Sequence, residues 1–307
     1  MLRLIVYRLL QLPVILAIVF IVTFTLVWIV PGNPLDNPEG KRPPAEVVEA
    51  MKREYNLHSP WAFCKSYLTN VFTKADFGPS LYYQDQRVSS IISSSLPVSI
   101  QIGAAAMVVA IFLGTLAGIL GALKPGSFLD FSSMAMTLVG VSLPNFVTGS
   151  LFLVLFATML GLFPTGGWGH LDQLILPAIT LGLMPSAYIA RLVRLGLADV
   201  MNSDFVRTAR AKGLSRNKAL FKHALKVAYL PVVSYLGPAT ASVMTGSFVI
   251  EKVFNLPGMG EHFVNAVLNK DQFLILAVVL TYATMLVFFN LAVDIAYAYV
   301  DPRISLD

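Results

Sequence analysis

The sequence predicts an all-α polytopic membrane protein with six transmembrane helices. Its 307 residues are 56% hydrophobic and 13% charged, and the mean hydropathy is +0.71. Soluble domains carry about 25% charged residues, so the chain lies far outside their range. Six charge-free runs can each supply the ~20 apolar residues that cross a hydrocarbon core, namely residues 9–35, 88–123, 131–171, 173–190, 227–250 and 272–293.

The third run, residues 131–171, is long enough to raise the question of two spans. Two spans would need about 40 apolar residues and a polar turn, whereas only Ser142, Pro144 and Asn145 interrupt this run. We therefore expect one long or kinked helix that bends at Pro144. Four further prolines predict breaks in the spans that flank the basic loop, at Pro177, Pro185, Pro231 and Pro238.

The distribution of lysine and arginine predicts the orientation, because short cytoplasmic loops retain these residues preferentially. Nine of them lie between Arg191 and Lys226, and none lies at residues 163–172. Both termini are then cytoplasmic. No small-x-small cleavage site follows the first run, so we expect a retained anchor. The predicted organisation is an N-terminal transmembrane anchor at 1–30, an extracytoplasmic segment at 31–96, a five-helix core at 97–301 with a cytoplasmic loop at 191–228, and a cytoplasmic tail at 302–307.

The sequence offers no motif for catalysis or metal binding. Its four histidines lie far apart, its single cysteine is Cys64, and no zinc-binding or nucleophile motif occurs. Residues 121–127 have the glycine spacing of a phosphate-binding loop but lack the lysine–serine pair that such a loop needs. We therefore expect a protein that is not an enzyme and has no metal or cofactor of its own, in which Cys64 is an inert thiol.

Two features within the spans carry further information. Small residues recur at Ala110, Gly114 and Gly118, and such a stripe lets two helix backbones approach closely in lipid. Asp294 is the acidic residue that we place within a span. An intramembrane carboxylate is a functional candidate by default. Because Asp294 lies about two turns before Asp301 and the chain end, we favour a structural role at the membrane interface.

The basic stretch that begins near residue 203 predicts a helix, a glycine corner and a second helix. Asn202 or Ser203 can cap the first helix, Gly213 can end it in a left-handed conformation, and Ser215 can cap the second. Two interpretations stay open. The first helix can bind in a groove of another protein, whereas the basic residues of the second helix suit anionic lipid headgroups.

At these residues the chain resembles the membrane subunits of binding-protein-dependent ABC importers, in the peptide (oligopeptide and dipeptide) permease group. Gly213 occupies the glycine of the family's shared loop, Ala209 its second alanine and Leu225 its leucine. The stretch "ARAKGL" followed by "HALK" is the peptide-permease version of that loop. The general pattern is broken at Arg207, Thr208, His223 and Lys226. The resemblance covers nearly the whole chain and includes "DFGPS", "SLPVS", "SLPNF" and "TGSFVIEKVFNLPGMGEHFVNAVLNKD".

The resemblance implies a type I ABC importer permease bundle that imports oligopeptides, with dipeptides or metal complexes as alternative cargo. The implied partners are a second homologous permease subunit, two cytoplasmic ABC ATPase subunits that bind ATP and magnesium, an extracytoplasmic peptide-binding protein and membrane lipid, with no nucleic acid. The corner would be a coupling helix that contacts an ATPase through Asp204, Phe205, Arg207, Thr208, Ala209, Arg210, Ala211, Lys212, Gly213, Leu214 and Ser215.

The glycine-rich turn at residues 255–261 suggests an outer gate, with a plain loop as the alternative. Its candidate residues are Leu256, Pro257, Gly258 and Gly260. Two other classes of transport protein remain as rivals. An ion-coupled secondary transporter predicts midplane carboxylates or broken-helix sites, and the spans offer Asp294 alone, away from the centre. A stand-alone channel predicts a selectivity ring, and no filter-like segment is present.

Overall fold

The computed structural model describes residues 2–31, 35, 45–83, 85–123 and 125–300. The predicted tail at 302–307, Lys124 and most of the proline-rich start of the segment at 31–96 lie outside the described residues. The helices, in which η marks a π-helical segment, are α1 (Leu2–Ile29), α2 (Ala45–Glu54), α3 (Pro60–Lys74), α4 (Val88–Leu123), α5 (Phe128–Ser142), α6 (Asn145–Phe152), η1 (Leu153–Met159), α7 (Leu171–Val200), α8 (Asp204–Ala211), α9 (Arg216–Ala219), η2 (Leu220–Ala224), α10 (Leu225–Ala228), α11 (Leu230–Val253), α12 (Met259–Leu268) and α13 (Gln272–Val300).

Four of the described helices are long and apolar enough to cross a membrane. They are Arg8–Ile29 within α1, all of α4, all of α7, and Gln272–Ile295 within α13. A fifth span arises if Arg216–Ala228 and Leu230–Met244, which meet at 51°, are one bent span. A shorter apolar helix covers Asn145–Met159. The membrane bundle is thus confirmed, and the count of six spans stays a prediction.

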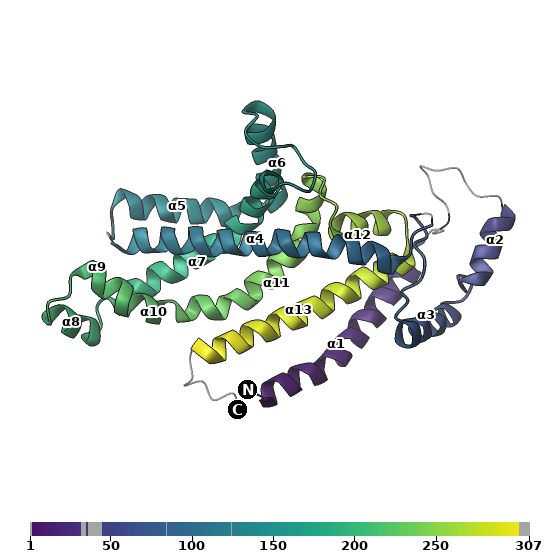
Figure 1. Ribbon diagram of the computed structural model, residues 1–307, viewed down its shortest axis with the longest axis horizontal. Coiled ribbons are helices and arrows are strands. Elements are labelled where there is room, and N and C mark those ends of the chain that lie inside the picture. The colour runs from purple at the N-terminus through teal and green to yellow at the C-terminus, as the bar shows by residue number, and fades with distance from the viewer. Residues whose placement is uncertain (1, 32–34, 36–44, 84, 124, 301–307) are drawn as a thin grey trace. The chain divides into compact units, whose positions relative to one another are not determined.

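The third apolar run does not form one helix. α5 ends at Ser142, and the chain turns through Pro144, which has φ −58° and ψ 140°, into α6 (Figure 1). The bend at Pro144 is therefore present. Helical structure stops at Met159, however, and residues 160–170 are not helical. The expected kinked helix therefore reaches only Met159, because positive φ angles follow at Gly161, Gly167 and Gly169.

Three of the four predicted proline breaks are absent. α7 continues through Pro177 and Pro185, and α11 continues through Pro238. The remaining break lies at Tyr229, two residues before Pro231. A proline removes one hydrogen bond of its helix, and packing of neighbouring helices can hold the helix together at that point. Pro177 and Pro185 are both buried, which explains why α7 stays continuous.

One compact unit comprises residues 1–5, 100–256 and 288–307, and α7 is its central helix. α5, α6, α10 and α11 all pack against α7. The α4 segment of this unit approaches α7 through the small residues of its stripe. A Cβ atom added to Gly114 would lie 2.6 Å from the Ser186 carbonyl oxygen, and one added to Gly118 would lie 2.7 Å from that of Ala190. These two helix backbones are therefore in direct contact, which only glycine permits.

The other compact unit comprises residues 6–99 and 257–287, and its core is aromatic. Rings from α1, α3 and α13 contact one another, with the centroids of Phe63 and Phe273 4.9 Å apart. Phe63 and Tyr67 are almost completely buried. The cluster consists of Phe20, Phe24, Trp28, Tyr55, Phe63, Tyr67 and Phe273.

Asp271 fastens the segment after α3 to the start of α13 in this unit. Its fully buried carboxylate accepts hydrogen bonds from the Ser80 hydroxyl and from the backbone N–H groups of Leu81 at 2.8 Å and Tyr82 at 3.1 Å. The Leu274 N–H donates to its other oxygen at 3.1 Å. Burial raises the pKa of Asp271, and these hydrogen bonds oppose that rise.

Candidate functional site

The basic stretch forms a corner made of α8 and α9 at the end of α7 (Figure 1). α8 follows Ser203 and is closed by Gly213, whose φ is +95°. The Gly213 N–H donates to the Arg210 carbonyl at 2.9 Å, and the Leu214 N–H donates to the Ala209 carbonyl at 3.2 Å. This pair of bonds is the Schellman arrangement that ends many helices at glycine. A Cβ atom at Gly213 would meet nothing within 4 Å, so backbone conformation and not space requires the glycine.

The second helix of the corner begins at Ser215. The Ser215 hydroxyl accepts a hydrogen bond from the Lys218 N–H at 3.4 Å, and α9, η2 and α10 then follow without interruption. The predicted helix, glycine corner and second helix are therefore confirmed as local structure.

Buried apolar side chains anchor this corner to α7. Val206 is the buried residue of α8 and packs with Leu197 of α7 and Leu220 of η2. A Cβ atom at Gly196 would lie 2.8 Å from the Ala228 carbonyl oxygen, so α7 and α10 are in backbone contact. This packing makes the corner and the end of α7 one rigid element. The cluster comprises Ala110, Ile189, Val193, Leu197, Val206, Ala219, Leu220, Ala224, Ala228 and Val232.

The residues predicted to contact an ATPase lie on the outside of this corner. Ala209 and Leu214 are half-buried, and the other nine are exposed, namely Asp204, Phe205, Arg207, Thr208, Arg210, Ala211, Lys212, Gly213 and Ser215. Phe205 exposes 47% of its surface, which leaves one large apolar side chain among the charged ones. An exposed ion pair within α8 joins Arg207 to Asp204, with 3.8 Å between the charged atoms. The corner thus presents an exposed, mostly cationic surface with the apolar Phe205 near its start.

An ion pair between α5 and α7 stands close to the corner. Arg194 donates two hydrogen bonds to the carboxylate of Asp130, one of them 2.8 Å long. The Gly126 N–H donates to the same carboxylate at 2.9 Å. The Arg194 guanidinium and then the Gly126 N–H lower the pKa of Asp130 to about 2. Sequence reasoning missed this pair because its members are 64 residues apart and no local pattern links them.

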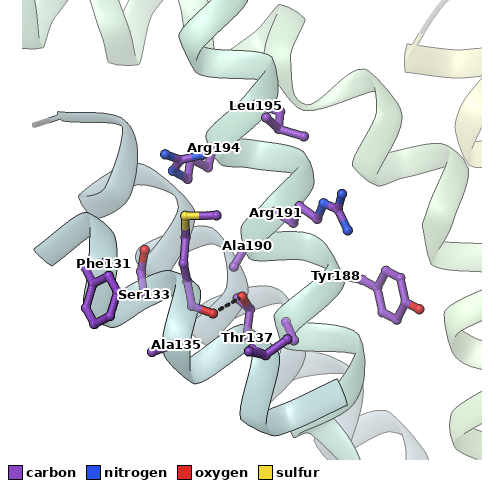
Figure 2. A pocket seen from close by; sticks show the side chains of 12 residues that line it. Phe131, Ser133, Ala135, Thr137, Tyr188, Ala190, Arg191, Arg194 and Leu195 are labelled. Carbon is purple, nitrogen blue, oxygen red and sulfur yellow. Dashed lines mark hydrogen bonds between the residues drawn. The ribbon is translucent and has the colours of Figure 1, made fainter. Parts of the chain in front are cut away.

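A cavity of about 610 Å³ opens beside this ion pair, between α5 and α7 (Figure 2). Arg194 points toward α5, whereas Arg191 and Tyr188 project from the other side of α7. A second cavity of about 800 Å³ shares the wall residues Phe131, Ala135 and Ala190. Sequence reasoning did not predict either cavity, since both arise from the angle at which helices pack.

The four predicted gate residues differ in exposure. Leu256, Gly258 and Gly260 are buried, and Pro257 is exposed. Gly258 precedes the first residue of α12, and the Met259 N–H donates to the Ser99 hydroxyl at 2.9 Å. Leu256 belongs to one compact unit and the other three residues belong to the second. A gate at these residues stays a prediction.

Two acidic residues lie within or beside the apolar helices. Asp294 lies in α13 and is half-buried. Glu251 is completely buried near the end of α11, one residue beyond the apolar run that the sequence defined. Hydropathy reports how apolar a segment is but not which side chains face inward, so no local pattern indicates this burial. Among the described residues, no group of three or more His, Cys, Asp or Glu side chains could hold a metal ion. Burial raises the pKa of the Cys64 thiol.

Solved structures with similar folds identify the class of the bundle. The inward-facing methionine ABC transporter MetNI matches with a TM-score of 0.59 and 16% identity, over 69% of this chain and 97% of that chain. An amino acid ABC transporter matches with a TM-score of 0.54 and 14% identity, over 69% of this chain and 94% of that chain. The protein has the fold of type I ABC importer permeases.

Sequence comparison then defines the family. Residues 110–306 match the family described as binding-protein-dependent transport system inner membrane component, and residues 1–103 match its N-terminal counterpart. The chain is 43% identical to the oligopeptide transport system permease protein OppB of Haemophilus influenzae and 41% identical to that of Escherichia coli K12, over 99% of each chain. It is 37% identical to the dipeptide transport system permease protein DppB of Bacillus subtilis, over 92% of each chain. The chain belongs to the family of inner membrane components of binding-protein-dependent transport systems and is a multi-pass inner membrane protein.

Proposed function

We propose that this chain is the pore-forming permease subunit of an ATP-driven importer that carries oligopeptides across the inner membrane. The observation that carries the proposal is the exposed corner at Gly213, rigidly anchored to α7, in a chain that is similar over 99% of its length to oligopeptide permease proteins. The similarity to a dipeptide permease makes dipeptides the second candidate cargo.

In this proposal the corner lies on the cytoplasmic side, as do both termini. Two ABC ATPase subunits bind ATP and magnesium, and one of them receives α8 in a cleft. Movement of that cleft would be transmitted as a tilt of α7, because Val206 and the contact between Gly196 and Ala228 join the corner to α7. Alternating access then needs two arrangements of the bundle, each favoured by different contacts.

The remaining partners follow from the same assignment. A second permease subunit of similar size would complete the pore, and an extracytoplasmic binding protein would deliver the peptide to the outer side. The permease itself would hydrolyse no ATP and would hold no cofactor. The mostly cationic surface of Arg207, Arg210 and Lys212 suits an ATPase cleft with acidic residues.

Cysteine cross-linking tests the contact with the ATPase. Single cysteines replace Ala209 or Ala211 in a Cys64→Ser background, and Lys222→Cys, which is exposed on the second helix, serves as the control. We expect oxidative cross-links from positions 209 and 211 to an ATPase subunit, and we expect ATP to change their yield. Equal cross-linking from position 222, or protection of all three positions by anionic lipid, would contradict the coupling assignment.

Reconstitution tests the transport activity. Proteoliposomes that contain both permease subunits and the ATPases should take up labelled oligopeptides when the binding protein and ATP are supplied. Uptake of labelled dipeptides made of the same amino acids tests the second candidate cargo. Uptake driven by an ion gradient without ATPases would instead establish a secondary transporter.

A further inference from the structure

The cavity between α5 and α7 is lined mostly by apolar side chains. Phe131, Met134 and Leu138 of α5 expose 72%, 51% and 69% of their surfaces, and Leu195 of α7 exposes 47%. Such side chains in a membrane helix need an apolar neighbour to fill the space beside them. The complete lining is Phe131, Ser133, Met134, Ala135, Thr137, Leu138, Ala187, Tyr188, Ala190, Arg191, Arg194 and Leu195.

Most of the polar groups in this lining already have partners. The Ser133 hydroxyl donates to the Asp130 carbonyl at 2.9 Å. The Thr137 hydroxyl donates to the Met134 carbonyl at 2.7 Å, and Figure 2 marks this second bond with a dashed line. Arg194 is held by the Asp130 carboxylate. Arg191, in contrast, is exposed and forms no ion pair with any carboxylate in the described part of the chain. Within the part of the chain that the structure describes, the cavity therefore has Arg191 as an unpaired cation at its rim and little else that is polar.

The position of Arg191 along α7 places it at the edge of the hydrocarbon core. The charge-free residues 173–190 span about 27 Å at the helical rise of 1.5 Å per residue, close to the thickness of the core. Arg191 is the first charged residue after this stretch. The cavity extends from Arg191 back toward Ala187 and across to Leu138, which lie on the apolar side of that edge.

A ligand that suits this site has one anionic group at the membrane interface and a hydrocarbon chain within the core, which are the features of an anionic lipid. We propose that this cavity binds an anionic phospholipid, whose acyl chain lies between α5 and α7 and whose phosphate pairs with Arg191 at the rim of the cavity, on the side of α7 that carries Tyr188. Basic pockets between membrane helices bind acidic lipid headgroups in this way. A peptide fits the cavity less well, because its backbone N–H and C=O groups need hydrogen-bond partners and most of the lining is apolar. The proposal goes beyond the transport assignment and does not rest on the nature of the cargo.

Native mass spectrometry of the purified importer complex tests the proposal. The complex is titrated with phosphatidylglycerol and, separately, with phosphatidylcholine of identical acyl chains. Arg191→Gln should weaken phosphatidylglycerol binding about five-fold, the effect of roughly 1 kcal/mol for one cation near the headgroups, and should leave phosphatidylcholine binding unchanged. Arg191→Lys should keep most of the preference. Arg53→Gln, which removes an exposed cation of α2 outside the cavity, should change neither lipid.

A second variant tests the site of the acyl chain. Ala135→Trp fills the cavity without altering charge and should weaken the binding of both lipids. Equal effects of Arg191→Gln and Arg53→Gln would overturn the proposal, as would unchanged binding in Ala135→Trp. Displacement of phosphatidylglycerol by peptides with a free carboxylate, dependent on Arg191, would assign the cavity to cargo instead. If the complex imports no peptide yet shows the expected lipid dependence, the transport assignment fails and the lipid site stands.

Discussion

The guanidinium of Arg194 donates two hydrogen bonds to the carboxylate of Asp130. Asp130 lies in the first turn of α5, and Arg194 lies six residues before α7 ends at Val200. The Gly126 N–H donates a third hydrogen bond to this carboxylate, which belongs to a residue only 4% exposed. α8 starts a few residues after α7, so this ion pair fixes the part of α7 that carries the corner. Arg194 of this pair also lines the apolar cavity.

The geometry of this pair predicts that arginine is required. Arg194→Lys should lower the melting temperature, because an ammonium group cannot make the two parallel hydrogen bonds of a guanidinium. Arg194→Gln should lower it further by removing the charge. Thermal unfolding of the purified protein, followed by tryptophan fluorescence, measures both. Arg207→Gln is the control, since its ion pair with Asp204 is exposed and should contribute little. Equal melting temperatures for all three variants would contradict the assigned role.

The pKa of Asp130 predicts how acid affects this contribution. Its folded-state pKa of about 2 lies below the ordinary unfolded value of about 3.9. A group with a lowered pKa stabilises the folded state above the unfolded pKa and loses that contribution as the pH falls toward the folded pKa. The difference in melting temperature between the unmodified protein and Asp130→Asn should therefore be constant above about pH 5 and shrink between about pH 4 and 2. A difference that grows on acidification would show that another group controls the effect.

The conformation of Gly213 predicts a matched pair of substitutions. Gly213→Val should cost about 1–2 kcal/mol at the corner, because β-branched residues resist positive φ. Gly213→Asn adds a side chain into the same open space but tolerates that conformation. Peptide-stimulated ATP hydrolysis in the reconstituted importer should fall strongly for valine and little for asparagine. Equal activity of the two variants would remove the corner from the coupling mechanism.

The contact of Gly118 with α7 predicts a steric effect within the bundle. Gly118→Leu should cost about 1–3 kcal/mol or prevent folding, since its Cβ atom would lie 2.7 Å from the Ala190 carbonyl oxygen. Ala117→Leu is the control, because Ala117 borders the larger cavity and has room for a bigger side chain. The yield of folded, monodisperse protein in detergent measures both effects. A normal yield for Gly118→Leu would mean that α4 and α7 are farther apart than described here.

The hydrogen bonds of Asp271 predict a local effect in the other compact unit. Asp271→Ala leaves the N–H groups of Leu81 and Tyr82 without their acceptor and should destabilise that segment by about 3 kcal/mol. Limited proteolysis should then cut near residues 76–87 much faster than in the unmodified protein. Asp172→Ala, which removes an exposed carboxylate at the start of α7, should not change the cleavage rate. Resistance of both variants to proteolysis would argue against the fastening role.

The local conformation of the corner was predictable because it depends on neighbouring residues. Ser215 can cap a helix and Gly213 can adopt positive φ wherever they occur, and the structure places both as expected. The apolar runs at 9–35, 88–123, 173–190 and 272–293 likewise coincide with helices long enough to span, because a hydrocarbon core demands a minimum length of apolar sequence. The third run misled this reasoning, since hydropathy does not register the glycines that end helical structure after Met159.

By itself, the sequence determined that the protein is a helical membrane protein with a cationic corner after its central helix, because hydropathy, charge and capping act over short stretches of chain. The tertiary structure alone decided that Arg194 meets Asp130, that Asp271 meets Ser80, and that a cavity with Arg191 at its rim lies between α5 and α7. Residues that are 64 or 191 positions apart become partners only when helices pack, and which side chains then face one another depends on helix rotation and crossing angle. No short-range pattern encodes those two quantities.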